Sequence, residues 1–189
     1  MATQLRSRLD YADLAKTPND GRRYELLDGA LTVSPSATPL HQRVSKRLLM
    51  TLVNYFESSG LGEVFAAPTD VILTARDVFV PDLVVVTQPA QVSARAIEGP
   101  PALIVEILSP TNAQYDRVAK ARRYATLGVS HYWIVDPKAQ VIECYRNVDG
   151  RFVEVENTSS GAGSFSHPDF EGLSFDTNSL WEPPVTKRP

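Results

Sequence analysis

The segment from Pro100 to Pro137 constrains the fold of this chain more than any other part of the sequence. It contains an apolar run (PPALIVEIL), a turn with helix-capping residues, a helix predicted over Ala113–Leu127, and a second apolar run (HYWIVDP). A strand–helix–strand unit of this kind places its two strands parallel, with a right-handed crossover between them. Because the first run is apolar almost throughout, its strand should lie in a sheet covered on both faces. The sequence therefore predicts an α/β fold.

The flanking segments add strands and one more long helix. Asp-Gly pairs between alternating runs predict β-hairpins, because both residues tolerate positive φ. Apolar residues that recur every three to four positions predict a helix. We expect one domain over residues 1–182 with a mixed sheet flanked by helices, and a disordered tail over 183–189. The predicted elements are an N-terminal β-hairpin over Arg22–Ser34, a helix over Pro39–Ser58, strands over Glu63–Thr74 and around Asp82, and a C-terminal antiparallel extension around Asp149-Gly150.

Composition excludes several classes of protein. The 189 residues carry a net charge of −3, so no overall positive field draws the chain to nucleic acid or anionic lipid. A polyanionic partner must then be held by local patches or by a metal. The single cysteine excludes an intrachain disulfide framework and fits a reducing cytoplasm. No apolar stretch approaches the ~20 residues that span a bilayer, and MATQLRSRLDYADL lacks the apolar core of a secretory signal. We expect a cytoplasmic protein outside the membrane.

Two acidic residues interrupt apolar runs. Asp82 follows Pro81 in VFVPDLVVV, and Glu106 shares a strand face with Ile104 and Leu108. An ionised carboxylate is costly in such surroundings unless it is paired or bound to a metal. Each residue also has a structural interpretation, as a strand-start Asp at the solvent rim and as a Glu paired with Lys or Arg. Together, two carboxylates on neighbouring strands can converge on one hard cation through oxygen ligands.

The helix after Glu106 carries a third candidate, Lys120. Asp116, Lys120 and Tyr124 are spaced i, i+4, i+8 and share one face. One interpretation of Asp116 and Lys120 is an ordinary surface ion pair. The other is a lysine that reaches back to the strand-end carboxylate, orients the attacking water and stabilises negative charge. The small apolar residues of the other face, which suit packing on the sheet, are Val118, Ala121 and Ala125.

The remaining candidates have more ordinary alternatives. His41, on the apolar face of the first long helix, is typical of a histidine at the edge of a core. Glu25 in RYELLDG can face a site from the hairpin, but a plain cross-strand charge is the favoured interpretation. Two basic clusters can contact phosphates, although such clusters are more often solvated helix faces. They are Arg43, Lys46 and Arg47, and Lys120, Arg122 and Arg123.

The set YELLDG, a helix opening at His41, VPDLVVV, LIVEILSP, D-x-x-x-K-x-x-x-Y and GVSHYWIVDP resembles a large bacterial family of restriction-endonuclease-like proteins in the PD-(D/E)XK nuclease superfamily. The resemblance covers roughly residues 22–146, plus the short segment LSFDTNSLW near the end of the sequence. It implies an αβββαβ core, with Asp82 and Glu106 as metal ligands. One departure stands out, because the lysine expected two residues after Glu106 is Leu108. Either Lys120 supplies that charge from the following helix, or the site is weak or inactive.

The leading hypothesis is a metal-dependent endonuclease that hydrolyses phosphodiester bonds in DNA. Asp82 and Glu106 would hold Mg²⁺ or Mn²⁺, and Lys120 would position the water. Asp116 and Tyr124 would support Lys120 from one turn on either side. A homodimer is expected, since nucleases that cut both strands are commonly two-fold symmetric. The alternatives are an inactive nuclease-fold module that binds nucleic acid or a protein, and a structural protein with a buried Glu–Lys pair.

Overall fold

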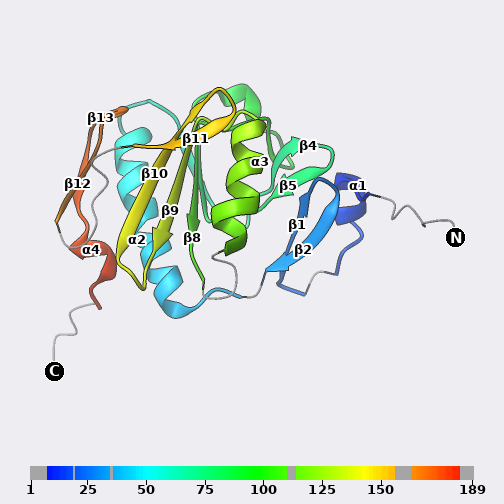
Figure 1. Ribbon diagram of the computed structural model, residues 1–189, viewed down its shortest axis with the longest axis horizontal. Helices are drawn as coiled ribbons and strands as arrows, with labels where there is room; N and C mark the ends of the chain where they lie inside the picture. Colours follow the sequence, from blue (N-terminus) through cyan, green and yellow to red (C-terminus); the bar gives the residue numbers. More distant parts are fainter. Residues whose placement is uncertain (1–7, 19, 35, 110–113, 156–162, 184–189) are drawn as a thin grey trace, which may run out of the picture.

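The centre of the structure is a six-stranded mixed sheet (Figure 1). The computed structural model describes residues 8–18, 20–34, 36–109, 114–155 and 163–183. In this sheet β8 and β9 run parallel, as the strand–helix–strand segment predicts, and the other neighbouring pairs are antiparallel. In spatial order the strands are β11 (Arg151–Glu154), β10 (Val141–Val148), β9 (His131–Asp136), β8 (Leu103–Ile107), β6 (Leu83–Val86) and β3 (Glu63–Ala66).

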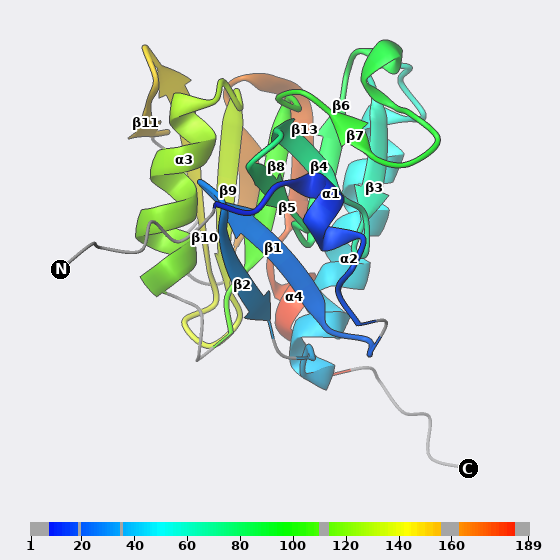
Figure 2. The same ribbon diagram turned by 90° about the vertical axis from the view of Figure 1, so that its right-hand side faces the viewer.

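A five-stranded sheet lies beside the central one, and its hairpin β1–β2 crosses in front of the central strands in Figure 2. The hairpin has the predicted Asp-Gly turn, with φ of 49° at Asp28 and 76° at Gly29. A separate two-stranded sheet pairs β12 (Ser164–His167) with β13 (Phe170–Asp176). The five strands, in spatial order, are β2 (Ala30–Ser34), β1 (Arg23–Leu27), β5 (Asp77–Phe79), β4 (Val71–Thr74) and β7 (Ile97–Glu98).

Helices cover both faces of the central sheet, with α3 in front of the strands and α2 behind them in Figure 1. The helix α2 (Pro39–Phe56) begins at the cap Thr38 and packs its apolar side on the first hydrophobic core. The other face carries η2 (Tyr115–Lys120), which is π-helical, and α3 (Ala121–Thr126). None of the helices in the described residues is long and apolar enough to span a membrane. The short elements are α1 (Tyr11–Leu14), η1 (Pro89–Gln91) and α4 (Asn178–Trp181).

Two predicted strands are each divided between the sheets. The run over Glu63–Thr74 forms β3 and β4, and the run VFVPDLVVV forms β5 and β6. A proline lies between the two halves of each run, Pro68 in the first and Pro81 in the second. Because proline has no N–H to donate, the ladder stops there and the chain crosses to the other sheet. Asp82 therefore lies in the crossing, directly before β6.

The other predicted elements agree with the structure within a few residues. The helix over Pro39–Ser58 is α2, and the closing hairpin is β10–β11. The predicted helix over Ala113–Leu127 is η2 and α3, and its start reaches into residues 110–113, which lie outside the described part of the chain. The expected tail lies outside it too, apart from Pro183. The order α2, β3, β6, β8, helix, β9 thus reproduces the expected αβββαβ core.

The helix η2–α3 packs residues of both its polar and its small apolar face, so the expectation from its small apolar residues is wrong only for Val118. Val118 is 61% exposed, whereas Lys120 and Tyr124 are buried. Ala125 is buried and Ala121 packs against the second hydrophobic core, both as expected. Polar residues can face the sheet here because buried carboxylates pair with them.

Candidate active site

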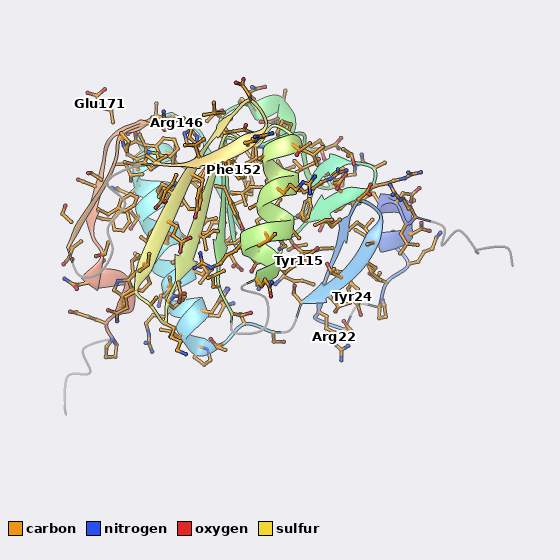
Figure 3. The ribbon with its side chains drawn as sticks, viewed as in Figure 1. Arg22, Tyr24, Tyr115, Arg146, Phe152 and Glu171 are labelled. Atoms are coloured by element: carbon orange, nitrogen blue, oxygen red, sulfur yellow. The ribbon has the colours of Figure 1, made fainter. Side chains whose placement is uncertain are left out.

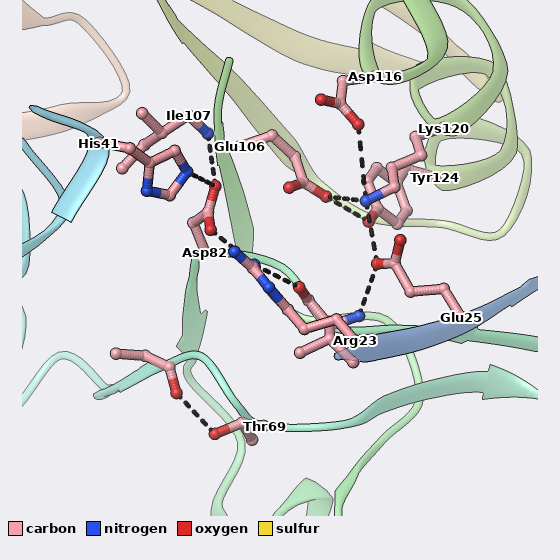
Figure 4. Close-up of polar contacts among 12 residues, drawn as sticks. Arg23, Glu25, His41, Thr69, Asp82, Glu106, Ile107, Asp116, Lys120 and Tyr124 are labelled. Atoms are coloured by element: carbon pink, nitrogen blue, oxygen red, sulfur yellow. Dashed lines mark hydrogen bonds and ion pairs between the residues drawn. The ribbon is translucent and has the colours of Figure 1, made fainter. Parts of the chain in front are cut away.

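Five elements besides β8 place the predicted site residues around the end of that strand (Figure 4). Leu83 pairs with Val105, so the start of β6 lies beside the end of β8 and brings Asp82 close to Glu106. The helix α2 contributes His41, η2 contributes Asp116 and Lys120, and α3 contributes Tyr124. The hairpin strand β1 contributes Glu25. The structure thus brings together all seven residues that the sequence singled out.

Asp82 is held by three donors although only 4% of it is exposed. Its Oδ2 accepts the backbone N–H of Ile107 at 2.8 Å and lies 3.0 Å from His41 Nε2, and Oδ1 accepts from Arg23 at 2.8 Å. Burial alone would raise the pKa of Asp82, but His41 and Arg23 outweigh it and lower the pKa. The carboxylate is therefore ionised and can only accept, so His41 Nε2 carries the proton in this contact.

Glu106 is oriented through one of its two oxygens. Oε1 accepts from Lys120 Nζ at 3.0 Å and from the Tyr124 hydroxyl at 2.9 Å. Figure 4 shows the second oxygen turned toward Asp82. Burial raises the pKa of Glu106 to about 8, with Lys120 acting against it and the neighbouring carboxylates adding to it. Glu106 is thus a carboxyl group that stays largely protonated near neutral pH unless another cation is added.

Lys120 is the cationic centre of the site. Its Nζ lies 2.9 Å from Glu25 Oε1, 3.0 Å from Glu106 Oε1 and 3.6 Å from Asp116 Oδ1. Burial would lower the pKa of the ammonium group, but the three carboxylates outweigh it and raise that pKa. Lys120 is therefore a permanent cation and cannot serve as a general base. The surface-pair interpretation of Asp116 and Lys120 is wrong, since both are about 5% exposed.

Glu25 is part of the same cluster, so the favoured expectation of a plain cross-strand charge is wrong. It is 1% exposed, and its Oε1 accepts both Lys120 Nζ and the Val80 N–H at 2.8 Å. Asp116 is also buried, and burial raises its pKa to about 6 against the influence of Lys120. Sequence reasoning missed Arg23, which binds Asp82. The available signal was strand alternation, because Arg23 and Glu25 are two residues apart and share a face.

A cavity of about 40 Å³ lies among these side chains. Four carboxylates and two permanently charged cations line it, which leaves an excess of two negative charges when every carboxylate is ionised. Its charged and imidazole-bearing lining residues are Arg23, Glu25, His41, Asp82, Glu106, Asp116 and Lys120.

The donor chemistry of the cavity fits a small hard cation. Within the described residues, no group of three or more Asp, Glu, His or Cys side chains forms a ready metal cluster. Mg²⁺ nevertheless binds through one or two carboxylates and keeps several waters, so a larger cluster is not required. Asp82 and Glu106 supply such carboxylates, and the excess negative charge matches a divalent ion.

Leu108 is not among the residues that line this cavity. It is 8% exposed and packs in the second hydrophobic core with Ile104 and Tyr124. Ile104, Glu106 and Leu108 share a strand face, as alternation predicts, and the residues between them belong to the first core. The lysine missing from the strand is thus matched by a lysine that reaches Glu106 from η2.

A second buried ion pair ties α3 to the five-stranded sheet. Asp77 is fully buried, and Arg123 donates to its two oxygens from Nε and Nη2 at 2.6 Å each. Arg47, from the other basic cluster, donates to the carbonyls of Leu180 and Glu182. Arg123 and Arg47 therefore make structural contacts, and the expectation of solvated basic helix faces is wrong for both.

Comparisons with known proteins agree with this fold. Residues 9–178 match the Uma2 family, described as "Putative restriction endonuclease". A protein of Synechocystis sp. described as uncharacterised is 27% identical over 133 residues, which cover 68% of each chain. The crystal structure of a "putative nuclease belonging to DUF820" from Anabaena variabilis superposes with a TM-score of 0.73 at 16% identity, and the match covers 92% of this chain and 97% of that one. The chain therefore belongs to the Uma2 family and has its restriction-endonuclease-like fold.

Proposed function

We propose that this protein is a metal-dependent endonuclease that hydrolyses phosphodiester bonds in DNA. The observation that carries the proposal is the convergence of Asp82, Glu106 and Lys120 on one buried cavity lined by four carboxyl groups and two permanent cations. Membership of a restriction-endonuclease-like family supports a nuclease-like activity. Such a site recognises the phosphodiester group, so the proposal concerns the reaction and leaves base specificity to other surfaces.

Asp82 and Glu106 would hold Mg²⁺ or Mn²⁺. The chemistry available from either ion is polarisation of the phosphate and a lower pKa for a bound water. Arg23 and His41 fix the Asp82 carboxylate, and Tyr124 turns Glu106 so that one oxygen faces Asp82. Side chains fixed in this way keep the ligand oxygens in place before the ion binds.

Lys120 would stabilise the negative charge that develops on the phosphate during attack by water. A preorganised cation is effective in a buried site, where little solvent screens it. Glu25 and Asp116 hold the ammonium group from two sides, so its position does not depend on Glu106 alone. Because its pKa is raised, Lys120 supplies charge and orientation and does not accept the proton.

The size of the cavity limits how the substrate approaches. At about 40 Å³ the cavity exceeds the roughly 10–15 Å³ that one water needs. An ion or a water fits inside, and a nucleotide does not. The DNA would therefore stay outside and present only phosphate oxygens to the cavity.

An inactive nucleic-acid-binding module is the second candidate. Two observations favour it, since Leu108 occupies the expected lysine position and protein donors already contact oxygens of both Asp82 and Glu106. A module of this kind would keep the fold and its outer surfaces without turnover.

Plasmid cleavage tests the proposal. Native protein, Asp82→Asn and Glu106→Gln are incubated with supercoiled, single-stranded and branched DNA in Mg²⁺, Mn²⁺ or EDTA. Asp169→Asn, which alters a distant surface ion pair with Arg146, is the control. We expect metal-dependent cleavage that falls about 100-fold or more in both site variants and is retained in the control. Mn²⁺ binding by the native protein without cleavage of any substrate would favour the inactive module.

A further inference from the structure

A groove of about 360 Å³ lies on the side of the η2–α3 helix that faces away from the candidate active site. Its volume is in the range of small-molecule sites, about 300–1,000 Å³. One wall comes from the helix and the other from the β10–β11 hairpin, and Figure 3 shows Phe152 on β11 beside α3. The side chains that matter are Arg117, Val118, Arg122, Tyr145, Arg151 and Phe152.

The groove is positively charged in a chain whose net charge is −3. Arg117 pairs with Glu143 and lies 3.8 Å from Asp136, so its charge is compensated. Arg122 and Arg151 are exposed, and no side chain among the described residues pairs with either. They stand on opposite walls, one on α3 and one on β11. Two free guanidinium groups fit phosphate oxygens, which they bind with directed hydrogen bonds.

Apolar and aromatic surface lies between these two cations. Val118 is 61% exposed on the helix wall. Phe152 stacks on Tyr132 with ring centroids 5.4 Å apart and an interplanar angle of 20°, so its ring is held in a fixed orientation. Tyr145 is held through its hydroxyl, which donates to Glu143. A rigid aromatic surface flanked by arginines is suited to an unpaired base joined to phosphate.

We propose that this groove binds one unpaired nucleotide of a nucleic-acid strand, with its base on the Phe152 side and flanking phosphates on Arg122 and Arg151. The inference deepens the proposed function and rests on it for the identity of the polymer. One helix would then serve both sites, because Lys120 faces the cavity and Arg122 faces the groove. A paired duplex keeps its bases stacked inside, so the groove selects single-stranded or frayed regions.

Fluorescence anisotropy in EDTA tests the groove without any cleavage. The probes are an oligothymidylate of about eight nucleotides, within the usual site sizes for single strands, its oligouridylate counterpart, an abasic strand of equal length and a blunt duplex. The variants are Arg122→Gln and Arg151→Gln. The matched control is Arg76→Gln, which removes an equal charge at an exposed turn between β4 and β5.

We expect each groove variant to bind oligothymidylate about tenfold more weakly, the loss of one charge-assisted contact. The slope of log affinity against log salt should fall by about 0.7 for each lost phosphate contact. Arg76→Gln should bind like the native protein. The abasic strand and the duplex should bind the native protein more weakly than oligothymidylate. Equal binding of oligouridylate would assign the groove to single strands of either sugar, and weaker binding would restrict it to DNA.

Three results would overturn the proposal. The first is native-like binding by both groove variants, and the second is equal binding of abasic and base-bearing strands. The third is a change in self-association by sedimentation velocity without a change in strand binding, which would make the groove a protein–protein surface. Strand binding is measured in EDTA and cleavage in Mg²⁺ or Mn²⁺, so the two proposals have separate readouts. The groove proposal can therefore be refuted while cleavage is observed, and the cleavage proposal can be refuted while the groove still binds the strand.

Discussion

Metal binding to this site should be coupled to the release of a proton from Glu106. Burial raises the pKa of Glu106 to about 8, so the carboxyl group is largely protonated at neutral pH without a cation. A metal ligand must be ionised, and the ion therefore competes with that proton. Asp82 adds no such competition, because His41 and Arg23 lower its pKa.

The size of the effect follows from the pKa of Glu106. The apparent affinity for the ion scales with the ionised fraction of this group. Between about pH 8.5 and about pH 6.5 that fraction falls about 25-fold for a pKa of about 8. At about pH 7 close to 0.9 proton per bound ion should be released from Glu106. Asp116, with a pKa of about 6, extends the fall at lower pH.

Isothermal titration calorimetry with Mn²⁺ measures both quantities. Titrations in buffers of different ionisation enthalpy count the protons, and a pH series gives the affinity. Glu106→Gln is the control, because it carries no titratable proton and should bind Mn²⁺ weakly with little change between about pH 8.5 and about pH 6.5. A native affinity that changes less than about threefold across this range would refute the coupling, as would equal proton release from Glu106→Gln.

Three further predictions follow from the same contacts. Folding raises the pKa of Glu106, so the folded state holds a proton that the unfolded state has already lost. In EDTA the free energy of unfolding should therefore fall as pH rises from about 4.5 to about 8, by about 1.4 kcal/mol per unit of pKa shift. Urea titrations that show rising stability over this range would contradict this. Arg123→Met leaves buried Asp77 without its cation and should cost about 3 kcal/mol in urea denaturation, while Mn²⁺ affinity at high pH should be unchanged. Tyr124→Phe removes a donor to Glu106 Oε1 and should cost about 1 kcal/mol; it should raise the pKa of Glu106, so calorimetry should show the Mn²⁺ affinity curve moved to higher pH.

Local patterns were sufficient for the elements and for part of the site. Strand alternation predicts that Glu106 and Leu108 share one face of their strand, and helical spacing predicts that Lys120 and Tyr124 share one face of their helix. Proline before Asp82 marked it as the start of a strand. Each of these relations spans only a few residues, which is the range over which backbone geometry fixes side-chain direction.

Contacts between distant segments were beyond such patterns. Within the hairpin, the neighbour of Glu25 is Thr32, and only the packing of η2 against the hairpin reveals Lys120, 95 residues away, as its partner. The contact between Arg23 and Asp82 could not be predicted for the same reason, because the two residues are far apart in the sequence. The burial of Lys120 and Tyr124 on η2–α3 was beyond hydrophobic periodicity, which assumes a solvated polar face. That assumption fails where buried carboxylates pair with the polar residues.

Glu106 contacts a lysine ammonium group although position 108 is leucine, because Lys120 supplies it from η2. The residues that hold this ammonium group in place therefore differ from those that would surround a lysine on the strand. A lysine at position 108 would have to leave the second core, where Leu108 packs against Ile104 and Tyr124. From η2 the ammonium group instead reaches Glu106 at 3.0 Å and is also held by Glu25 from the five-stranded sheet. The hairpin thereby becomes part of the site, since the same strand supplies Arg23 to Asp82. The strand β1 thus binds Asp82 directly through Arg23 and holds, through Glu25, the lysine that binds Glu106. A displacement of that strand would disturb Asp82 and Glu106 together.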